Sequence, residues 1–207
     1  VVIEDFLPLE VYKEIVKIFK NGEFVEINQV REERYKLWET LEDKHFPSDN
    51  EEYMAHFWSS FDVVSNPKII RMYDRYIKPL LEKILDEKNQ KVRHQATKYK
   101  NNGKNFTRIH YDDYMGSIGY ILYLTELDWK YDWGGQLQII KEGKILSHLP
   151  SPNKLIIVNH TLKNSHWVSP VSEWSKEDRN TLTGFCINKN LDLPDTWRNR
   201  KDISVIE

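Results

Sequence analysis

His110, Asp112 and His166 are the residues whose types and spacing could hold a metal ion. In an extended strand, side chains two residues apart point to the same face, so His110 and Asp112 could reach one ion together. A second histidine from a distant strand, His166, would complete a set of two histidines and one carboxylate. Such a set leaves positions open on octahedral Fe(II), which an oxygen-activating site needs. Alone, a His-x-Asp triplet is a weak signal, because a strand-end histidine beside a surface acid has the same pattern.

Arg179 and Tyr123 are candidate partners for a second, anionic group. Strand-like alternation places Arg179, Thr183 and Phe185 on one face. A guanidinium there could bind a dicarboxylate through paired, charge-assisted hydrogen bonds. The ordinary alternative is a surface arginine in an ion pair. Tyr123 lies in another strand-like segment and could offer its phenol to the same carboxylate, the alternative being a core tyrosine.

The first 90 residues have mostly helical periodicity. Pro8 opens a helix that Asn21 and Gly22 end, and Asn66 with Pro67 begins a longer helix in which Pro79 is a point where a kink could form. Short strands are expected at residues 1–6 and 24–27, and a loop at residues 47–50. Two further helical stripes are expected, with Tyr35, Trp38 and Leu41 in the first and Tyr53, Met54, Phe57, Trp58 and Phe61 in the second. We expect most of these aromatic side chains to pack in the core.

After residue 90 the periodicity becomes strand-like. Short segments bounded by turn residues are typical of a β-sandwich or jelly roll. We therefore expect a mainly β fold of the α+β kind, in which an N-terminal region at 1–90 supports a β core at 91–188. Residues 189–207 are expected to form a partly ordered tail, all within one structural domain. The expected strands are 92–100, 117–124, 136–140, 144–148, 154–159, 166–168 and 180–187.

Composition limits the classes of protein to consider. A chain of 207 residues can bury a sizeable core, and its 30 basic and 32 acidic residues form no long run of either sign. This pattern does not favour a nucleic-acid partner or a polybasic membrane anchor. No apolar run approaches the roughly 20 residues of a membrane span. The single cysteine, Cys186, excludes an internal disulfide framework and favours a reducing, cytoplasmic location.

In the order of its motifs, the chain resembles the Fe(II)/2-oxoglutarate-dependent dioxygenases, specifically the prolyl 4-hydroxylase-like branch that acts on protein prolines. The resemblance covers residues 90–188 well and the N-terminal helices loosely. Residues 3–8 also resemble the opening strand and helix of the family. The motifs that carry the resemblance are Tyr99 with Gly103 and Phe106, His110-Tyr111-Asp112, Tyr123-Leu124-Thr125, Asp128-Trp129, Gly134-Gly135, residues 154–157, residues 164–171, and Arg179 with Thr183.

The resemblance implies a double-stranded β-helix fold and a role for each motif. His110, Asp112 and His166 would be the iron ligands, and Arg179 would bind the distal carboxylate of 2-oxoglutarate. Trp129 and the double glycine would shape a turn and the core. Three further residues would stand with Arg179: Tyr123 and Thr183 at the same carboxylate, and Tyr99 beside the cosubstrate.

The implied reaction is the hydroxylation of a C–H bond, with release of succinate and CO2. Its cofactors would be Fe(II), 2-oxoglutarate and O2, with ascorbate as an optional reductant. The expected substrate is a proline within a protein or peptide. A free amino acid or another small molecule stays open as an alternative substrate, and so does a non-catalytic metal-binding jelly roll. Nucleic-acid demethylation by the same chemistry is disfavoured. The repair demethylases usually have a second arginine after the anchoring one on the same strand, and none follows Arg179 here.

The remaining histidines and the cysteine are not expected to take part in the chemistry. His94, His148 and His160 are interpreted as strand or surface histidines rather than extra ligands. Cys186 lies on the opposite face from Phe185 and is interpreted as a small core residue. The sequence does not indicate an oligomeric state.

Overall fold

The structure is a computed structural model that describes residues 1–30, 53–86, 88, 91–110, 112, 117–160, 164–186 and 203–206. The helical stripe expected at Tyr35, Trp38 and Leu41 and the loop expected at 47–50 lie outside the described residues. Tyr111 and most of the expected tail also lie outside them.

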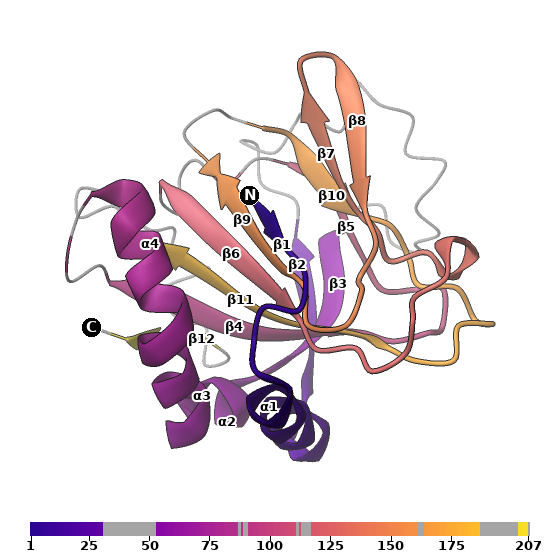
Figure 1. Cartoon of the computed structure of the whole chain (residues 1–207). Coiled ribbons are helices and arrows are strands. Elements are labelled where there is room, and N and C mark those ends of the chain that lie inside the picture. The colour runs from indigo at the N-terminus through magenta and orange to yellow at the C-terminus, as the bar shows by residue number, and fades with distance from the viewer. Residues whose placement is uncertain are drawn as a thin grey trace.

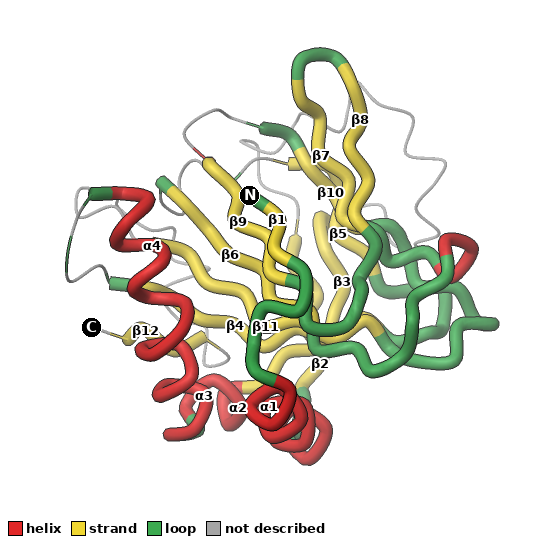
Figure 2. Tube along the Cα trace, in the orientation of Figure 1, coloured by secondary structure: helices red, strands yellow, loops and turns green. Residues whose placement is uncertain are grey.

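Antiparallel strands form most of the fold, and the helices gather on one side of them (Figures 1 and 2). The hydrogen-bonded order is β1-β9-β6-β11-β4-β3-β5-β10-β7-β8, with β12 added to β4 and β2 to β3. This is the mainly β jelly roll with supporting helices that the sequence predicts. The strands are β1 (Val2–Ile3), β2 (Val25–Val30), β3 (Tyr53–Ser60), β4 (Val92–Tyr99), β5 (Phe106–His110), β6 (Ile118–Tyr123), β7 (Leu137–Lys141), β8 (Lys144–His148), β9 (Leu155–Asn159), β10 (His166–Val168), β11 (Arg179–Cys186) and β12 (Ile203–Ile206).

The helices begin and end close to the predicted signals. Asn66 caps one of them, because its side chain accepts a hydrogen bond from the Lys68 N–H (3.0 Å), and Pro67 occupies the first turn. A π-helical turn ends just before Pro79, which lacks an N–H and would crowd the preceding turn of an α-helix. The helices are α1 (Leu9–Asn21), α2 (Phe61–Ser65), α3 (Pro67–Met72), the π-helix η3 (Tyr73–Ile77), α4 (Lys78–Leu85) and the 3-10 turn η4 (Tyr131–Trp133).

Two apolar cores hold these elements together. The first lies between the helices and the strands, where α1 and α3 meet residues of β4, β6, β9 and β11. Cys186 belongs to this core, as predicted for a small buried residue. The second core lies among the strands that carry the candidate metal ligands, and it includes Tyr99, Tyr123 and Trp129. The first core therefore braces the strands whose other face surrounds the site.

Residues 53–60 form strand β3, so the prediction of an amphipathic helix there is wrong. Ala55, Phe57 and Ser59 are buried and alternate with the half-buried His56 and Trp58, which is the period of a strand. The inward face thus includes an alanine and a serine, whose apolar signal is weak. The aromatic residues alone have a spacing that imitates a helix.

Phe57 packs in the second core, as expected for most of these aromatic residues. Phe61 does not, because it begins α2 with 47% of its surface exposed.

Strands β5 and β12 lie where the sequence pattern predicts none. In β5, the buried polar residues Thr107 and Arg108 interrupt the apolar pattern. β12 lies within the expected tail and pairs antiparallel with β4. None of the described helices has the length and apolar character needed to cross a membrane.

Candidate active site

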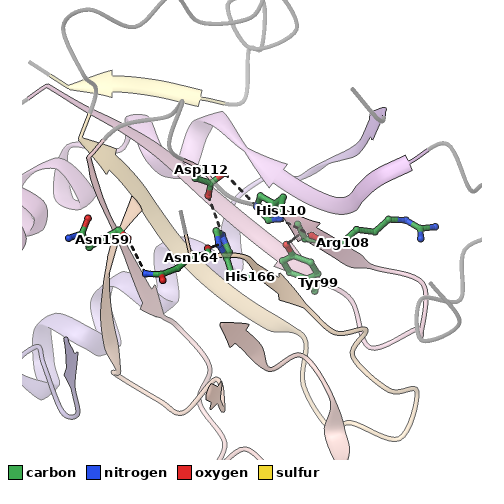
Figure 3. Close-up of polar contacts among 8 residues, drawn as sticks. Tyr99, Arg108, His110, Asp112, Asn159, Asn164 and His166 are labelled. Atoms are coloured by element: carbon green, nitrogen blue, oxygen red, sulfur yellow. Dashed lines mark hydrogen bonds and ion pairs between the residues drawn. The ribbon is translucent and has the colours of Figure 1, made fainter. Parts of the chain in front are cut away.

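The three candidate metal ligands converge from two adjacent strands (Figure 3). His110 ends β5 and is the direct cross-strand partner of His166 on β10. Asp112 follows β5, with one carboxylate oxygen 3.5 Å from His110 Nε2 and the other 3.3 Å from His166 Nε2. All three side chains are buried, and their ligand atoms lie within 4.8 Å of one another. The convergence predicted from the sequence is therefore present.

Both histidines are oriented by backbone carbonyl groups (Figure 3). His110 Nδ1 donates to the Arg108 carbonyl (2.7 Å), and His166 Nδ1 donates to the Asn164 carbonyl (3.0 Å). A proton on Nδ1 leaves the Nε2 lone pair of a neutral imidazole free. When both rings are neutral, two such lone pairs and the Asp112 carboxylate face one another, an arrangement of acceptors that a divalent cation satisfies. The residues present thus fit Fe(II).

Electrostatics also favour a cation at this position. Burial lowers the pKa of His110 to about 4, so this ring is neutral at pH 7. Burial raises the pKa of Asp112, but the opposing effects of His110 and His166 are larger and hold it below its usual range. Burial lowers the pKa of His166, but its hydrogen bond to Asp112 and that residue's charge produce a net increase. An ionised carboxylate therefore lies between two imidazoles.

Arg179 lies in a second polar part of the site. It is paired with Tyr99 across β11 and β4, and its guanidinium carbon is 4.9 Å from the Tyr99 ring centre and 5.2 Å from that of Tyr123. The guanidinium is buried, and its Nε has no hydrogen-bond partner in the part of the chain that the structure describes. A buried guanidinium with an unfilled donor is suited to a carboxylate ligand.

The two tyrosines beside Arg179 can both donate hydrogen bonds. Burial raises the pKa of Tyr99 and of Tyr123, and Arg179 opposes the shift without reversing it. Tyr99 shares a hydrogen bond of 2.6 Å with Thr107. The Tyr123 hydroxyl is buried beside the guanidinium and has no other partner among the described residues.

One cavity of about 110 Å³ joins the metal set to Arg179. Thr181, Thr183 and Phe185 line it from β11, as strand alternation predicts. Thr183 stands four residues beyond Arg179, a rise of about 13 Å in a strand. Its hydroxyl donates to the Gln95 carbonyl (3.2 Å). The structure therefore does not bring Thr183 to the end of the cavity where Arg179 lies.

The double glycine supports Arg179 from behind. Trp129 Nε1 donates to the Gly134 carbonyl (2.9 Å), and Trp129 is buried in the second core. A Cβ on Gly135 would lie 3.3 Å from Arg179 Cδ, so a side chain there would press on the arginine stem. The prediction that Trp129 and the glycines shape a turn and the core is confirmed.

His160 is a cavity residue whose position the sequence does not predict. The pattern indicates a strand or surface histidine, whereas the structure buries His160 in the cavity wall, with its ring centre 6.1 Å from that of His166. Burial lowers the pKa of His160 to about 4. The only local signal is its place directly after the apolar strand β9.

Residues 94–187 match the family model described as the 2OG-Fe(II) oxygenase superfamily, where 2OG is 2-oxoglutarate. This part of the chain belongs to that superfamily. It contains the His-Asp-His set and Arg179, in the order that the resemblance requires. The protein is thus a 2OG-Fe(II)-dependent oxygenase.

Solved structures with the same fold include other members of this superfamily. A prolyl-4-hydroxylase from Pseudomonas putida has a TM-score of 0.64 at 17% identity, over 91% of this chain and 92% of that chain. An oxidoreductase of the 2OG-Fe(II) oxygenase family from Burkholderia pseudomallei has a TM-score of 0.60 at 12% identity, over 89% of this chain and 83% of that chain. A Trichoplax adhaerens prolyl hydroxylase, in complex with a hypoxia inducible factor peptide fragment, has a TM-score of 0.57 at 17% identity. The match covers 91% of this chain and 83% of that chain. No curated protein sequence matches the chain.

Proposed function

We propose that this oxygenase hydroxylates a proline residue within a protein or peptide. When bound, Fe(II) supplies the oxidation of a C–H bond by O2, in which one oxygen atom enters the substrate as a hydroxyl group. The other oxygen atom enters succinate as 2-oxoglutarate loses CO2.

In this proposal, each end of the cavity has its own task. His110, Asp112 and His166 hold Fe(II) on one side and leave its other side open. Arg179 binds the distal carboxylate of 2-oxoglutarate, which fixes the orientation of the cosubstrate. The Tyr123 hydroxyl supports the same carboxylate, and Tyr99 forms the wall beside the cosubstrate.

The protein needs no general base or nucleophile for this chemistry, because the cofactor supplies the reactive species. Its own residues bind, orient and exclude water. Leu137, Val158 and Val168 give the cavity apolar walls. Such walls limit side reactions with water at the reacting centre.

The observation that carries the peptide assignment is the charge of the cavity. Among the described residues that line it, Asp112 and Arg179 are charged and His166 has a raised pKa, while burial keeps His110 and His160 neutral at pH 7. His166, like Asp112, is assigned to iron, and Arg179 is assigned to the cosubstrate. Among the described lining residues, no charged group then remains for the ammonium and carboxylate of a free amino acid, whereas a residue within a peptide has neither charge.

The similar structures support the same assignment at the level of the fold. The proteins from Pseudomonas putida and Trichoplax adhaerens are prolyl hydroxylases, and the second structure contains a peptide. Both cover most of this chain and most of their own length.

A turnover screen tests the proposal. Proline-containing peptides and free L-proline would be incubated with the protein, Fe(II), 2-oxoglutarate and O2, each with and without ascorbate as a reductant. We expect peptides to gain one oxygen atom on proline, measured by mass spectrometry, and to release succinate. The matched control is Asp112→Ala, which should abolish both products. Oxidation of free proline without peptide turnover would instead favour the small-molecule alternative.

A further inference from the structure

His160 lines the active-site cavity but belongs neither to the metal set nor to the pair of Arg179 and Tyr123. It follows β9 directly, and its backbone N–H donates to the Ser117 carbonyl (3.0 Å). Its imidazole is buried close to His166, yet it contributes no atom to the cluster of ligand atoms. A buried polar ring beside the iron site therefore requires another explanation.

The neighbouring strands hold this ring in one place. Gly119 on β6 also lines the cavity, and a Cβ there would lie only 2.4 Å from His160 Nε2. Phe185 on β11 packs against the imidazole, with ring centres 5.6 Å apart and planes at 32°. Glycine inside a strand often marks the close approach of another group. Strand β6 thus lacks a side chain where the imidazole lies.

The nitrogen held in this way lacks a partner. His160 Nε2 is buried, and no residue in the described part of the chain forms a hydrogen bond with it. A buried imidazole nitrogen without a partner costs free energy. A ligand group or an ordered water is the kind of partner that completes such an atom.

The position of His160 indicates which ligand this is. Phe185, which contacts His160, and Arg179 lie on the same inward face of β11, six residues or about 20 Å apart. His160 therefore stands at the opposite end of the cavity from Arg179, with the metal set in the same cavity. A cosubstrate anchored at Arg179 occupies one end, so a group near His160 belongs to the substrate.

A prolyl residue has no N–H, so the polar backbone groups next to its ring are carbonyl acceptors. A neutral imidazole has one N–H donor, which matches a carbonyl. We propose that His160 is a positioning residue that donates a hydrogen bond to a peptide carbonyl beside the target proline. This bond fixes which C–H bond faces the iron. The inference rests on the proposed prolyl substrate.

Kinetics and binding of His160→Phe test this role. For a peptide that the wild-type protein hydroxylates, we expect the KM to rise about tenfold, the usual effect of one lost hydrogen bond. The ratio of succinate to hydroxyproline should also rise, because a poorly held peptide is oxidised less often per cosubstrate consumed. The Kd of 2-oxoglutarate for the anaerobic Fe(II) protein, measured from its visible charge-transfer absorption, should stay the same. His160→Asn retains a donor and should recover part of the loss.

The control is His148→Phe, which changes a histidine on β8 that does not line the cavity. If His160→Phe fails to fold by circular dichroism, Gly119→Ala makes the same test, because it displaces the ring without removing it. Unchanged KM and product ratio in an active, folded variant would overturn the role of His160 alone. A parallel loss of 2-oxoglutarate affinity would also overturn it, because His160 would then serve the cosubstrate. A wild-type protein that hydroxylates no peptide would overturn the proposed function as well.

Discussion

Each histidine of the metal set is oriented by the carbonyl of the residue two positions before it. Arg108 serves His110 in this way, and Asn164 serves His166. Because both contacts are local, the direction of each ring is set by its own segment of backbone. The two imidazole rings of His110 and His166 lie next to each other because β5 pairs with β10. The ligand geometry is therefore prepared before a metal binds, which reduces the cost of assembling the site.

Arg179→Ala is expected to weaken the binding of 2-oxoglutarate by about 10- to 100-fold, the range for a lost hydrogen bond to a charged group. Fe(II) affinity should change little, because the metal ligands remain. Isothermal titration under anaerobic conditions measures both. Arg179→Lys keeps the charge but loses the paired geometry and should be intermediate. Arg71→Ala, an exposed arginine on α3, is the matched control. Equal 2-oxoglutarate affinity in Arg179→Ala and the wild type would contradict the anchor role.

The metal set and Arg179 can be predicted from the sequence because few structural needs place those residue types in that order. His160 cannot be predicted in this way. Its burial depends on Gly119 and Phe185, which belong to other strands. For Thr183, alternation correctly predicts that the side chain faces the cavity. Alternation does not show that the four-residue separation places Thr183 too far along the strand to share a carboxylate with Arg179.

At the scale of elements, the turn before β7 requires glycine at position 134 for two reasons, a left-handed backbone and a lack of space for a side chain. Gly134 has φ of +71°, and a Cβ there would lie 2.0 Å from the Pro170 carbonyl oxygen. Gly143, in the β7–β8 turn, has φ of +74°, but a Cβ there would meet nothing within 4 Å. Both positions favour glycine, whereas only the first also requires the space.

Gly143→Ala should therefore lower the free energy of unfolding by about 1 kcal/mol, the cost of a left-handed backbone for alanine. Gly134→Ala should lower it by more, because the clash with main chain adds to the same strain. Urea denaturation of the two variants and the wild type measures the difference. Equal losses would show that the Pro170 segment moves away without cost.

Elements that carry their own start and stop signals can be predicted well. Pro8 and Asn66 mark helices correctly, and most strands after residue 91 begin within two residues of the expected position. Strand β3 is missed because Ala55 and Ser59 are buried by pairing with β2, β4 and β5, which no local pattern shows. Pairing between distant strands overrides local periodicity there.

At the scale of the molecule, His94 links the stability of the first core to pH. It is buried between η3 and β6, where its Nδ1 accepts a hydrogen bond from the Tyr120 hydroxyl (2.6 Å) and its ring centre is 4.4 Å from that of Tyr73. Burial lowers the pKa of His94 to about 3. An unfolded histidine binds a proton below its ordinary pKa of about 6.5, whereas folded His94 does not.

The stability associated with neutral His94 is therefore present above pH 6.5 and is lost as the pH falls from about 6.5 toward 3. In that window, His94 alone should reduce the free energy of unfolding by about 1.4 kcal/mol per pH unit. Denaturation curves across the window should be less steep in pH for His94→Gln, which keeps an acceptor for Tyr120. Burial also lowers the pKa of His148, a half-buried histidine on the otherwise exposed strand β8, so His148→Gln is the comparison and should change the pH slope less than His94→Gln. An unchanged pH slope in His94→Gln would contradict a buried, neutral His94.

The strand order has a consequence for how the protein is made. Val2 pairs with Ile156, and His110 pairs with His166, so the sheet is built from contacts between distant parts of the chain. Contacts of this kind form slowly, and partly built sheets expose unpaired edges. A ribosome must release the chain beyond His166 before the metal set can close. The complete metal set can therefore bind iron only after the segment that contains His166 has been made, well after His110.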